Sequence, residues 1–176
     1  KRGDVVGMIH SDVVASSCAS GPASVIRRVD CADMEGAARA VARRFHLSGL
    51  HGLDFIRNAE GKAYLLEINP RATQTSYLAF GPGRDLLAGL LERASGAHCR
   101  PRAPATPNHL IALFPQEWAR DPASPYLKSA FHDIPWDDPD LLRAWLAVTP
   151  AHKPRAAQET HLPAKKRVYG METIAS

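Results

Sequence analysis

The chain has 176 residues, the length of one ordinary domain with an appendage. Its hydrophobic content of 45% and charged content of 23% are normal for a globular protein, and no apolar run is long enough to span a bilayer. A membrane role is therefore not expected. The formal charge of +4 comes largely from linker-like and terminal sequence, which argues against nucleic-acid binding.

Three cysteines, Cys18, Cys31 and Cys99, lie far apart and form no Cys-x-x-Cys pair. This spacing argues against a disulfide framework and a structural zinc site, and it fits a reducing, cytoplasmic location. The chain begins at Lys1 without a methionine or a signal-like segment, and strand-like sequence follows almost at once. We therefore expect a piece of a longer polypeptide.

The first elements in chain order are two strands and a helix. Residues 5–10 and 24–29 are rich in β-formers, and the small residues between them favour an antiparallel connection. Asp33 is placed to cap a helix that runs to about residue 47, in which apolar residues recur at helical spacing.

A hairpin and a second helix come next. Strands are expected at 49–58 and 62–69, joined by a turn in which Gly61 takes a positive φ. A helix over 85–94 should end near Gly96. Strand, strand, helix, hairpin and helix predict an α+β fold, an antiparallel β-sheet with packed helices.

Prolines at 101, 104 and 107 predict an extended connector, so a boundary is expected near residue 97. The predicted division is a subdomain at 1–97, a small C-terminal extension at 98–149 and a basic, irregular tail at 150–176. Within the extension we expect a strand over 109–114 and a helix over 139–148, capped by Asp138.

The hairpin holds the chemistry. Glu67, Asn69 and Arg71 should point the same way because side chains alternate along a strand. Asp54 lies opposite position 65 or 67, and either pairing puts it on the face of Glu67. Two carboxylates and an amide oxygen are ligands that Mg²⁺ or Mn²⁺ prefers, so we predict a metal site that serves a phosphate chain.

At these residues the chain resembles the ATP-grasp superfamily, specifically the C-terminal part of its nucleotide-binding module in carbamoyl-phosphate synthetase, biotin carboxylase and carboxylate–amine ligases. The matching stretches are Ser48-Gly-Leu-His-Gly-Leu-Asp-Phe-Ile56 and Leu65-Leu-Glu-Ile-Asn-Pro-Arg-Ala-Thr-Gln74, and the likeness spans roughly residues 3–96. Gly52 stands where some peptide ligases of the family have an arginine, which argues against a close relation to D-alanine–D-alanine ligases.

The resemblance implies roles for particular residues. Asp54, Glu67 and Asn69 would bind Mg²⁺ (or Mn²⁺), and Arg71 would face the substrate or an acyl phosphate. Ile56 and Leu66 would form apolar walls for the adenine of ATP. Strict alternation puts Leu66 on the face opposite Glu67, so the strand must twist or bulge, or the pairing is less simple.

Plainer interpretations stand beside these. Arg71 could instead form a structural ion pair with Glu67. Arg27 and Arg28 lie on a strand that should flank the nucleotide, where either could contact phosphate or be a surface arginine. An acidic group near Trp136 is better explained by helix capping and turn formation than by a second metal site. The stretch Gly81-Pro82-Gly83 is better explained as a turn and helix start than as a phosphate-binding loop. The acidic group comprises His132, Asp133, Asp137, Asp138 and Asp140.

The leading hypothesis is the C-terminal half of an ATP-dependent, ADP-forming ligase that activates a carboxylate substrate as an acyl phosphate for attack by an amine or similar nucleophile. The N-terminal lobe of the same polypeptide would be its partner, the piece alone would be inactive, and a homo-oligomer is left open. The alternative is a non-catalytic nucleotide- or protein-binding fragment, and a basic-tailed interaction protein is a weaker third.

Overall fold

The computed structural model describes residues 2–18, 21–148 and 168–175. The chain divides into two compact units. Unit 1 comprises Lys1–Asp12, Arg28–Pro107 and Lys166–Ser176, and unit 2 comprises Val13–Arg27 and Asn108–Lys165. The first break after the hairpin thus follows residue 107, whereas the sequence suggested a boundary near residue 97.

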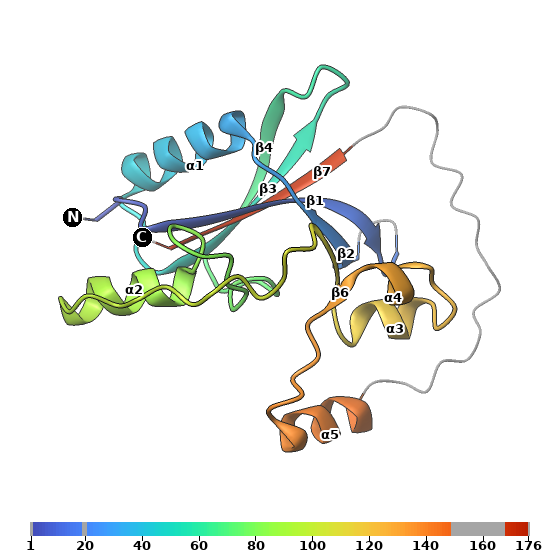
Figure 1. Cartoon of the computed structure of the whole chain (residues 1–176). Coiled ribbons are helices and arrows are strands. Elements are labelled where there is room, and N and C mark those ends of the chain that lie inside the picture. The colour runs from blue at the N-terminus through green and yellow to red at the C-terminus, as the bar shows by residue number, and fades with distance from the viewer. Residues whose placement is uncertain (1, 19–20, 149–167, 176) are drawn as a thin grey trace. The chain divides into compact units, whose positions relative to one another are not determined.

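Unit 1 is an antiparallel sheet with helices on both faces, so the predicted α+β fold is confirmed (Figure 1). Its strands follow the order β4-β3-β7-β1. The elements are the start of β1 (Gly7–Ser16), α1 (Ala32–Phe45), β3 (Leu50–Arg57), β4 (Ala63–Asn69), α2 (Leu86–Ser95) and β7 (Val168–Ala175).

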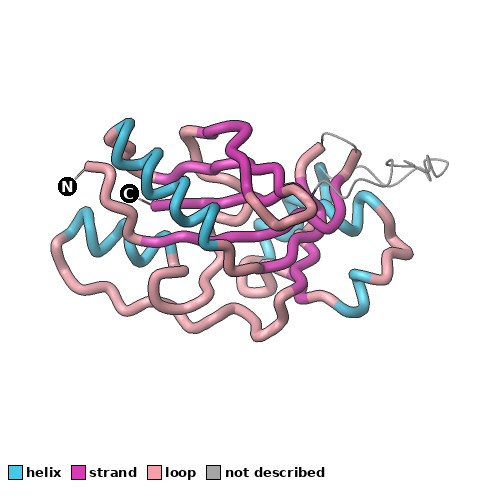
Figure 2. The backbone as a smooth tube through the Cα atoms, turned by 90° about the horizontal axis from the view of Figure 1, so that it is seen from above, coloured by secondary structure: helices cyan, strands magenta, loops and turns pink. Residues whose placement is uncertain are grey.

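The core of unit 1 lies between α1 and the sheet. Met34, Ala38 and Ala42 recur every fourth residue of α1 and are fully buried against Leu53 and Phe55 of β3. Figure 2 shows α1 lying across the strands. This packing leaves the alternate residues of β3, among them Asp54, to the opposite face of the sheet.

The start of α1 differs from the prediction. The cap position is Cys31, which makes no side-chain capping bond, and Asp33 lies within the first turn of the helix. Its carboxylate instead accepts a hydrogen bond from the N–H of Ala63 at 3.4 Å. A carboxylate in the first turn still stabilises the positive end of the helix dipole.

Unit 2 contains β2 (Ala23–Arg28), which pairs with β5 in antiparallel fashion, and β6, which pairs with β5 in parallel. The other elements are β5 (Leu110–Ala112), α3 (Gln116–Arg120), α4 (Tyr126–Ser129), β6 (Phe131–His132) and α5 (Pro139–Val148). The predicted strand and helix of the extension are confirmed as β5 and α5, and Asp138 caps α5 by accepting from the N–H of Leu141 at 2.9 Å.

The expectation of an irregular tail is wrong for its last residues. Residues 168–175 form β7, which pairs along its length with β3 and also with β1. The strand pairs with residues more than a hundred positions earlier, so its signal was not local. Residues 149–167 lie outside the described part of the chain.

Candidate metal and nucleotide site

The β3–β4 hairpin brings the two predicted carboxylates together. Asp54 pairs with Glu67, and Gly52 pairs with Asn69. The turn that joins the strands is fixed by Asn58, whose side-chain oxygen accepts from the N–H of Lys62 at 2.8 Å, and by Gly61 with φ of 83°. Of the two pairings that the sequence allowed, the structure has position 54 opposite position 67.

A β-bulge lies directly beside this pair. Phe55 pairs with Leu65 while Asp54 pairs with Glu67, so Leu66 is an extra residue in β4. A bulge interrupts strict alternation and turns the following side chains. It accounts for the position of Leu66, which is 55% exposed and lies off the core that takes up Leu65.

Asp54 sits in surroundings that disfavour its charge. Partial burial and the nearby Glu67 carboxylate raise its pKa above the usual range. The side-chain N–H of Asn69, which donates to the Asp54 carboxylate at 3.3 Å, and the charge of Arg71 offset part of this rise. A divalent cation would remove the repulsion between the two carboxylates.

Glu67 and Arg71 keep their charged groups available. Glu67 is exposed and, within the described residues, has no hydrogen-bond or ion-pair partner. Among the described residues, the guanidinium of Arg71 donates only to the carbonyl of Ala72, at 3.2 Å, and its backbone N–H donates to the carbonyl of Asn69 at 2.8 Å. The alternative ion pair between Arg71 and Glu67 is therefore not formed among the described residues.

The donor set fits a hard cation. Asp54, Glu67 and Asn69 offer oxygen ligands from one face of the hairpin, as Mg²⁺ and Mn²⁺ prefer, while zinc would call for histidine or cysteine. In the described part of the chain no three His, Cys, Asp or Glu side chains gather as a metal cluster. A cation here would rest on two carboxylates and one amide, and would take its other ligands from phosphate or water.

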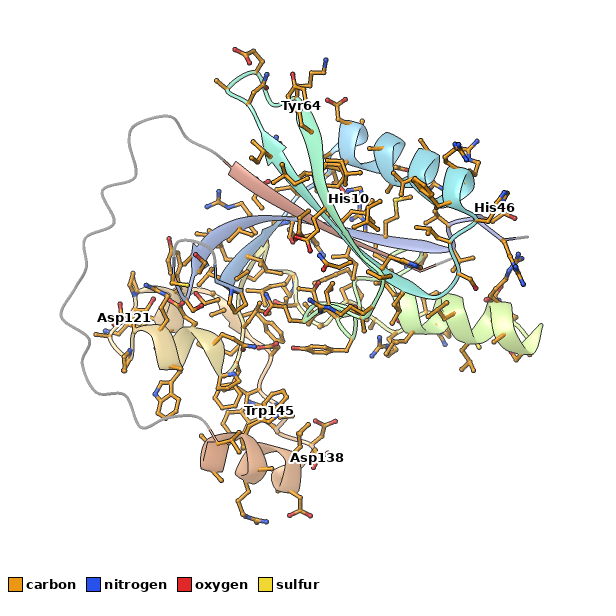
Figure 3. The ribbon with its side chains drawn as sticks, turned by 180° about the vertical axis from the view of Figure 1, so that it is seen from behind. His10, His46, Tyr64, Asp121, Asp138 and Trp145 are labelled. Carbon is orange, nitrogen blue, oxygen red and sulfur yellow. The ribbon has the colours of Figure 1, made fainter. Side chains whose placement is uncertain are left out.

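The apolar residues expected beside adenine lie on the same hairpin. Ile56 pairs with Tyr64, one step toward the turn from the bulge. Ile56 is half-buried, and Tyr64, labelled near the end of the hairpin in Figure 3, is exposed. Ile56, Tyr64 and Leu66 give the hairpin an apolar surface beside its carboxylates.

The two arginines expected near phosphate differ. Arg28 belongs to unit 1, where its guanidinium lies 4.8 Å from the centre of the Phe80 ring. Arg27 is exposed and belongs to unit 2. Both phosphate assignments stay predictions.

The remaining acidic group is structural in its contacts. The Asp133 carboxylate accepts the N–H of Phe114 at 2.5 Å, while burial raises the pKa of Asp133 to about 6. His132 contacts the carbonyl of Leu127 at 3.0 Å, and Asp138 caps α5. Gly81 likewise belongs to a turn, closed by the N–H of Arg84 on its carbonyl at 3.0 Å.

The structure combines an antiparallel α+β unit with a hairpin that presents facing carboxylates and an amide. Residues 7–75 match the family model of the ATP-grasp domain, which supports membership of the ATP-grasp superfamily. The match takes in the hairpin and supports an ATP-binding, ligase-type function. No curated protein and no solved structure matched the chain.

The described residues contain no helix long and apolar enough to cross a membrane. Sequence reasoning allowed for a bulge at Leu66 as one of its alternatives, and it overlooked a second feature of the site, the close approach of Thr73 to Gly52. A glycine two residues before a strand carboxylate was a signal for the second, because glycine in a strand often marks a close neighbour.

Proposed function

We propose that unit 1 provides the metal-binding wall of a Mg-ATP site that activates a carboxylate substrate as an acyl phosphate. The observation that carries the proposal is the direct pairing of Asp54 with Glu67, beside the Asn69 amide, where no described residue neutralises the Glu67 carboxylate. A facing carboxylate pair costs electrostatic free energy unless a cation binds it. The ATP-grasp match supports the nucleotide as the source of phosphate.

Each residue of the hairpin then has a part. Asp54, Glu67 and Asn69 hold the cation, which when bound would neutralise charge on the terminal phosphates. Arg71 faces the carboxylate or the transferring phosphoryl group, because a guanidinium suits both. Ile56 and Leu66 pack against adenine, and Arg28 contacts phosphate.

The reaction has two steps. A carboxylate oxygen of the substrate attacks the γ-phosphorus, the bond to the β–γ bridging oxygen breaks, and ADP leaves with that electron pair. An amine or similar nucleophile then attacks the acyl carbon, and inorganic phosphate leaves with the electrons of the C–O bond. The nucleophile loses its proton to solvent or a base.

The test compares Glu67→Gln with Glu60→Gln in the full-length protein. Glu60 is exposed in the turn of the same hairpin, so it is a matched carboxylate outside the site. ADP release would be measured with a panel of carboxylic acids, and hydroxylamine would trap any acyl phosphate as a hydroxamate. Mn²⁺ affinity in the presence of ATP would be measured by titration.

Glu67→Gln should lower ADP release by at least about a hundredfold and weaken Mn²⁺ binding, because a lost charge-stabilising group typically costs that much. Glu60→Gln should change neither. Retained ADP release in Glu67→Gln would refute the metal assignment. ADP release without hydroxamate, for every acid of the panel, would refute the acyl phosphate.

A further inference from the structure

The segment that follows the metal ligands, residues 71–76, is seated against β3 at Gly52. A methyl group placed on Gly52 would lie 2.4 Å from Cγ2 of Thr73, which is far inside van der Waals contact. The next nearest atom is Cβ of Asn69, at 3.5 Å. The Thr73 methyl thus occupies the space in front of Gly52.

This space opens on the face of the metal site. Gly52 and Asp54 are two residues apart on β3, so they share a face, and Gly52 pairs with Asn69 across the hairpin. Thr73 therefore packs beside the ligand Asn69. The segment that carries Arg71 meets the sheet at this point.

Thr73 is held in place by its own neighbours. Its N–H donates to Oγ of Ser76 at 2.8 Å, and its carbonyl accepts the N–H of Ser76 at 3.1 Å. Its hydroxyl lies 3.3 Å from those of Ser76 and Thr75, both buried. Rotating the Thr73 side chain to relieve a clash would break the contacts of its hydroxyl with Thr75 and Ser76, so we expect an added methyl to displace the segment instead.

We propose that Gly52 is a positioning residue, whose missing side chain lets Thr73 dock on β3 and so sets Arg71 beside the metal ligands. The steric part stands on the structure alone, and the consequence for the reaction rests on the proposed function. Arg71 already follows Asn69 closely, with its N–H on the Asn69 carbonyl. Displacing the segment would move its guanidinium while leaving Asp54 and Glu67 paired.

The experiment uses Gly52→Ala, Thr73→Ser and the double variant that combines them. Thr73→Ser removes the Cγ2 methyl that would clash and keeps the hydroxyl. Gly36→Ala is the matched control, because a methyl on Gly36 of α1 would meet nothing within 4 Å. Three quantities would be measured in the full-length protein: amide hydrogen exchange over residues 71–76, Mn²⁺ affinity with ATP, and ADP release with the best carboxylic acid of the panel.

Gly52→Ala should speed exchange over residues 71–76 by at least about tenfold. It should also lower ADP release by about 10- to 100-fold, the usual cost of misplacing a reacting group, while Mn²⁺ affinity changes less than about threefold. Gly36→Ala should change none of these. The double variant should return exchange and rate to within about threefold of Thr73→Ser alone.

Unchanged exchange in Gly52→Ala, or a double variant no better than Gly52→Ala, would overturn the proposal. Equal losses of Mn²⁺ affinity and rate would also overturn it, because they would make Gly52 a structural residue of the strand. If Gly52→Ala does not fold, a folded double variant supports the steric contact and an unfolded one refutes it. If the wild-type protein releases no ADP, the proposed function fails. The hydrogen-exchange comparison still tests whether Thr73 packs against Gly52.

Discussion

Asp54 and Asp85, two acidic residues of unit 1, have opposite electrostatic surroundings. The buried Asp85 carboxylate caps α2 through the N–H of Ala88 and accepts from the backbone N–H, Nε and Nη2 of Arg102 at 2.8 to 2.9 Å. The hydrogen bonds to Arg102 lower the pKa of Asp85 to about 2. Asp54 has one amide donor, at 3.3 Å, and a like charge opposite, and its pKa is raised.

The contrast separates a carboxylate that stabilises the fold from one that is available to a ligand. The charged form of Asp85 stabilises the folded state, because protein N–H groups donate hydrogen bonds to its carboxylate. For Asp54, burial and the Glu67 charge outweigh the support from Asn69 and Arg71, so its charge is a net cost until a cation neutralises it. Unit 2 repeats the first pattern in Glu117, which is fully buried and bonded to Arg120 and Ser124.

The largest stability change is expected at Asp85. Asp85→Ala should lower the free energy of unfolding by roughly 2–3 kcal/mol, because it removes a helix cap and several charge-assisted hydrogen bonds. Urea unfolding at neutral pH would measure the loss. Asp140→Ala is the control, since this carboxylate is 91% exposed in its pair with Arg143, and its change should stay within about 0.5 kcal/mol. A loss at Asp85 no larger than at Asp140 would break the comparison.

Asp54→Asn should act in the opposite sense on the free protein. A raised pKa means that the folded state holds more protons than the unfolded state between pH 3.8 and the raised value, so stability falls as pH rises through that window. Removing the charge should therefore raise stability at neutral pH by roughly 0.5–1 kcal/mol, a gain limited by solvent screening. The fall in the free energy of unfolding with rising pH over that window, expected for the wild-type protein, should be smaller in Asp54→Asn.

The same variant should lose its response to metal. Mn²⁺ should raise the melting temperature of the wild-type protein, since a ligand that binds only the folded state stabilises it, and should leave Asp54→Asn nearly unchanged. Thermal unfolding with and without MnCl₂ would measure both effects. Equal metal stabilisation in the two proteins would place the cation elsewhere.

Local patterns in the sequence predicted most of unit 1. The hairpin turn at Asn58 and Gly61 and the left-handed end of α2 at Gly96 rest on residues within a few positions of one another. The facing of Asp54 and Glu67 also follows from local rules, because turn length and strand alternation fix the register to within one bulge.

What could not be predicted depends on contacts between distant residues. β7 lies between β3 and β1, and nothing in Val168–Ala175 alone selects these two partners. The choice of a bulge at Leu66 among the alternatives that the sequence left open depends on how β4 meets β3, and the contact of Thr73 with Gly52 depends on where a loop folds back. Periodicity describes a segment, whereas these features belong to pairs of segments.

The smallest effect is expected at His51, a buried polar residue that tests whether every unpartnered polar group serves the site. Its Nδ1 is buried without a partner in the described residues, although no catalytic part is proposed for it. His51→Leu should change the free energy of unfolding by less than about 1 kcal/mol, because replacing an unsatisfied buried group by an apolar one is near neutral or stabilising. The exposed His109→Leu is the control.

ADP release by His51→Leu should stay within about twofold of the wild-type rate, since a residue without contact to the reacting atoms leaves their geometry unchanged. A large loss of ADP release in folded His51→Leu would show that the unpartnered imidazole serves the site, and accessibility would no longer distinguish a functional polar group from a packing defect.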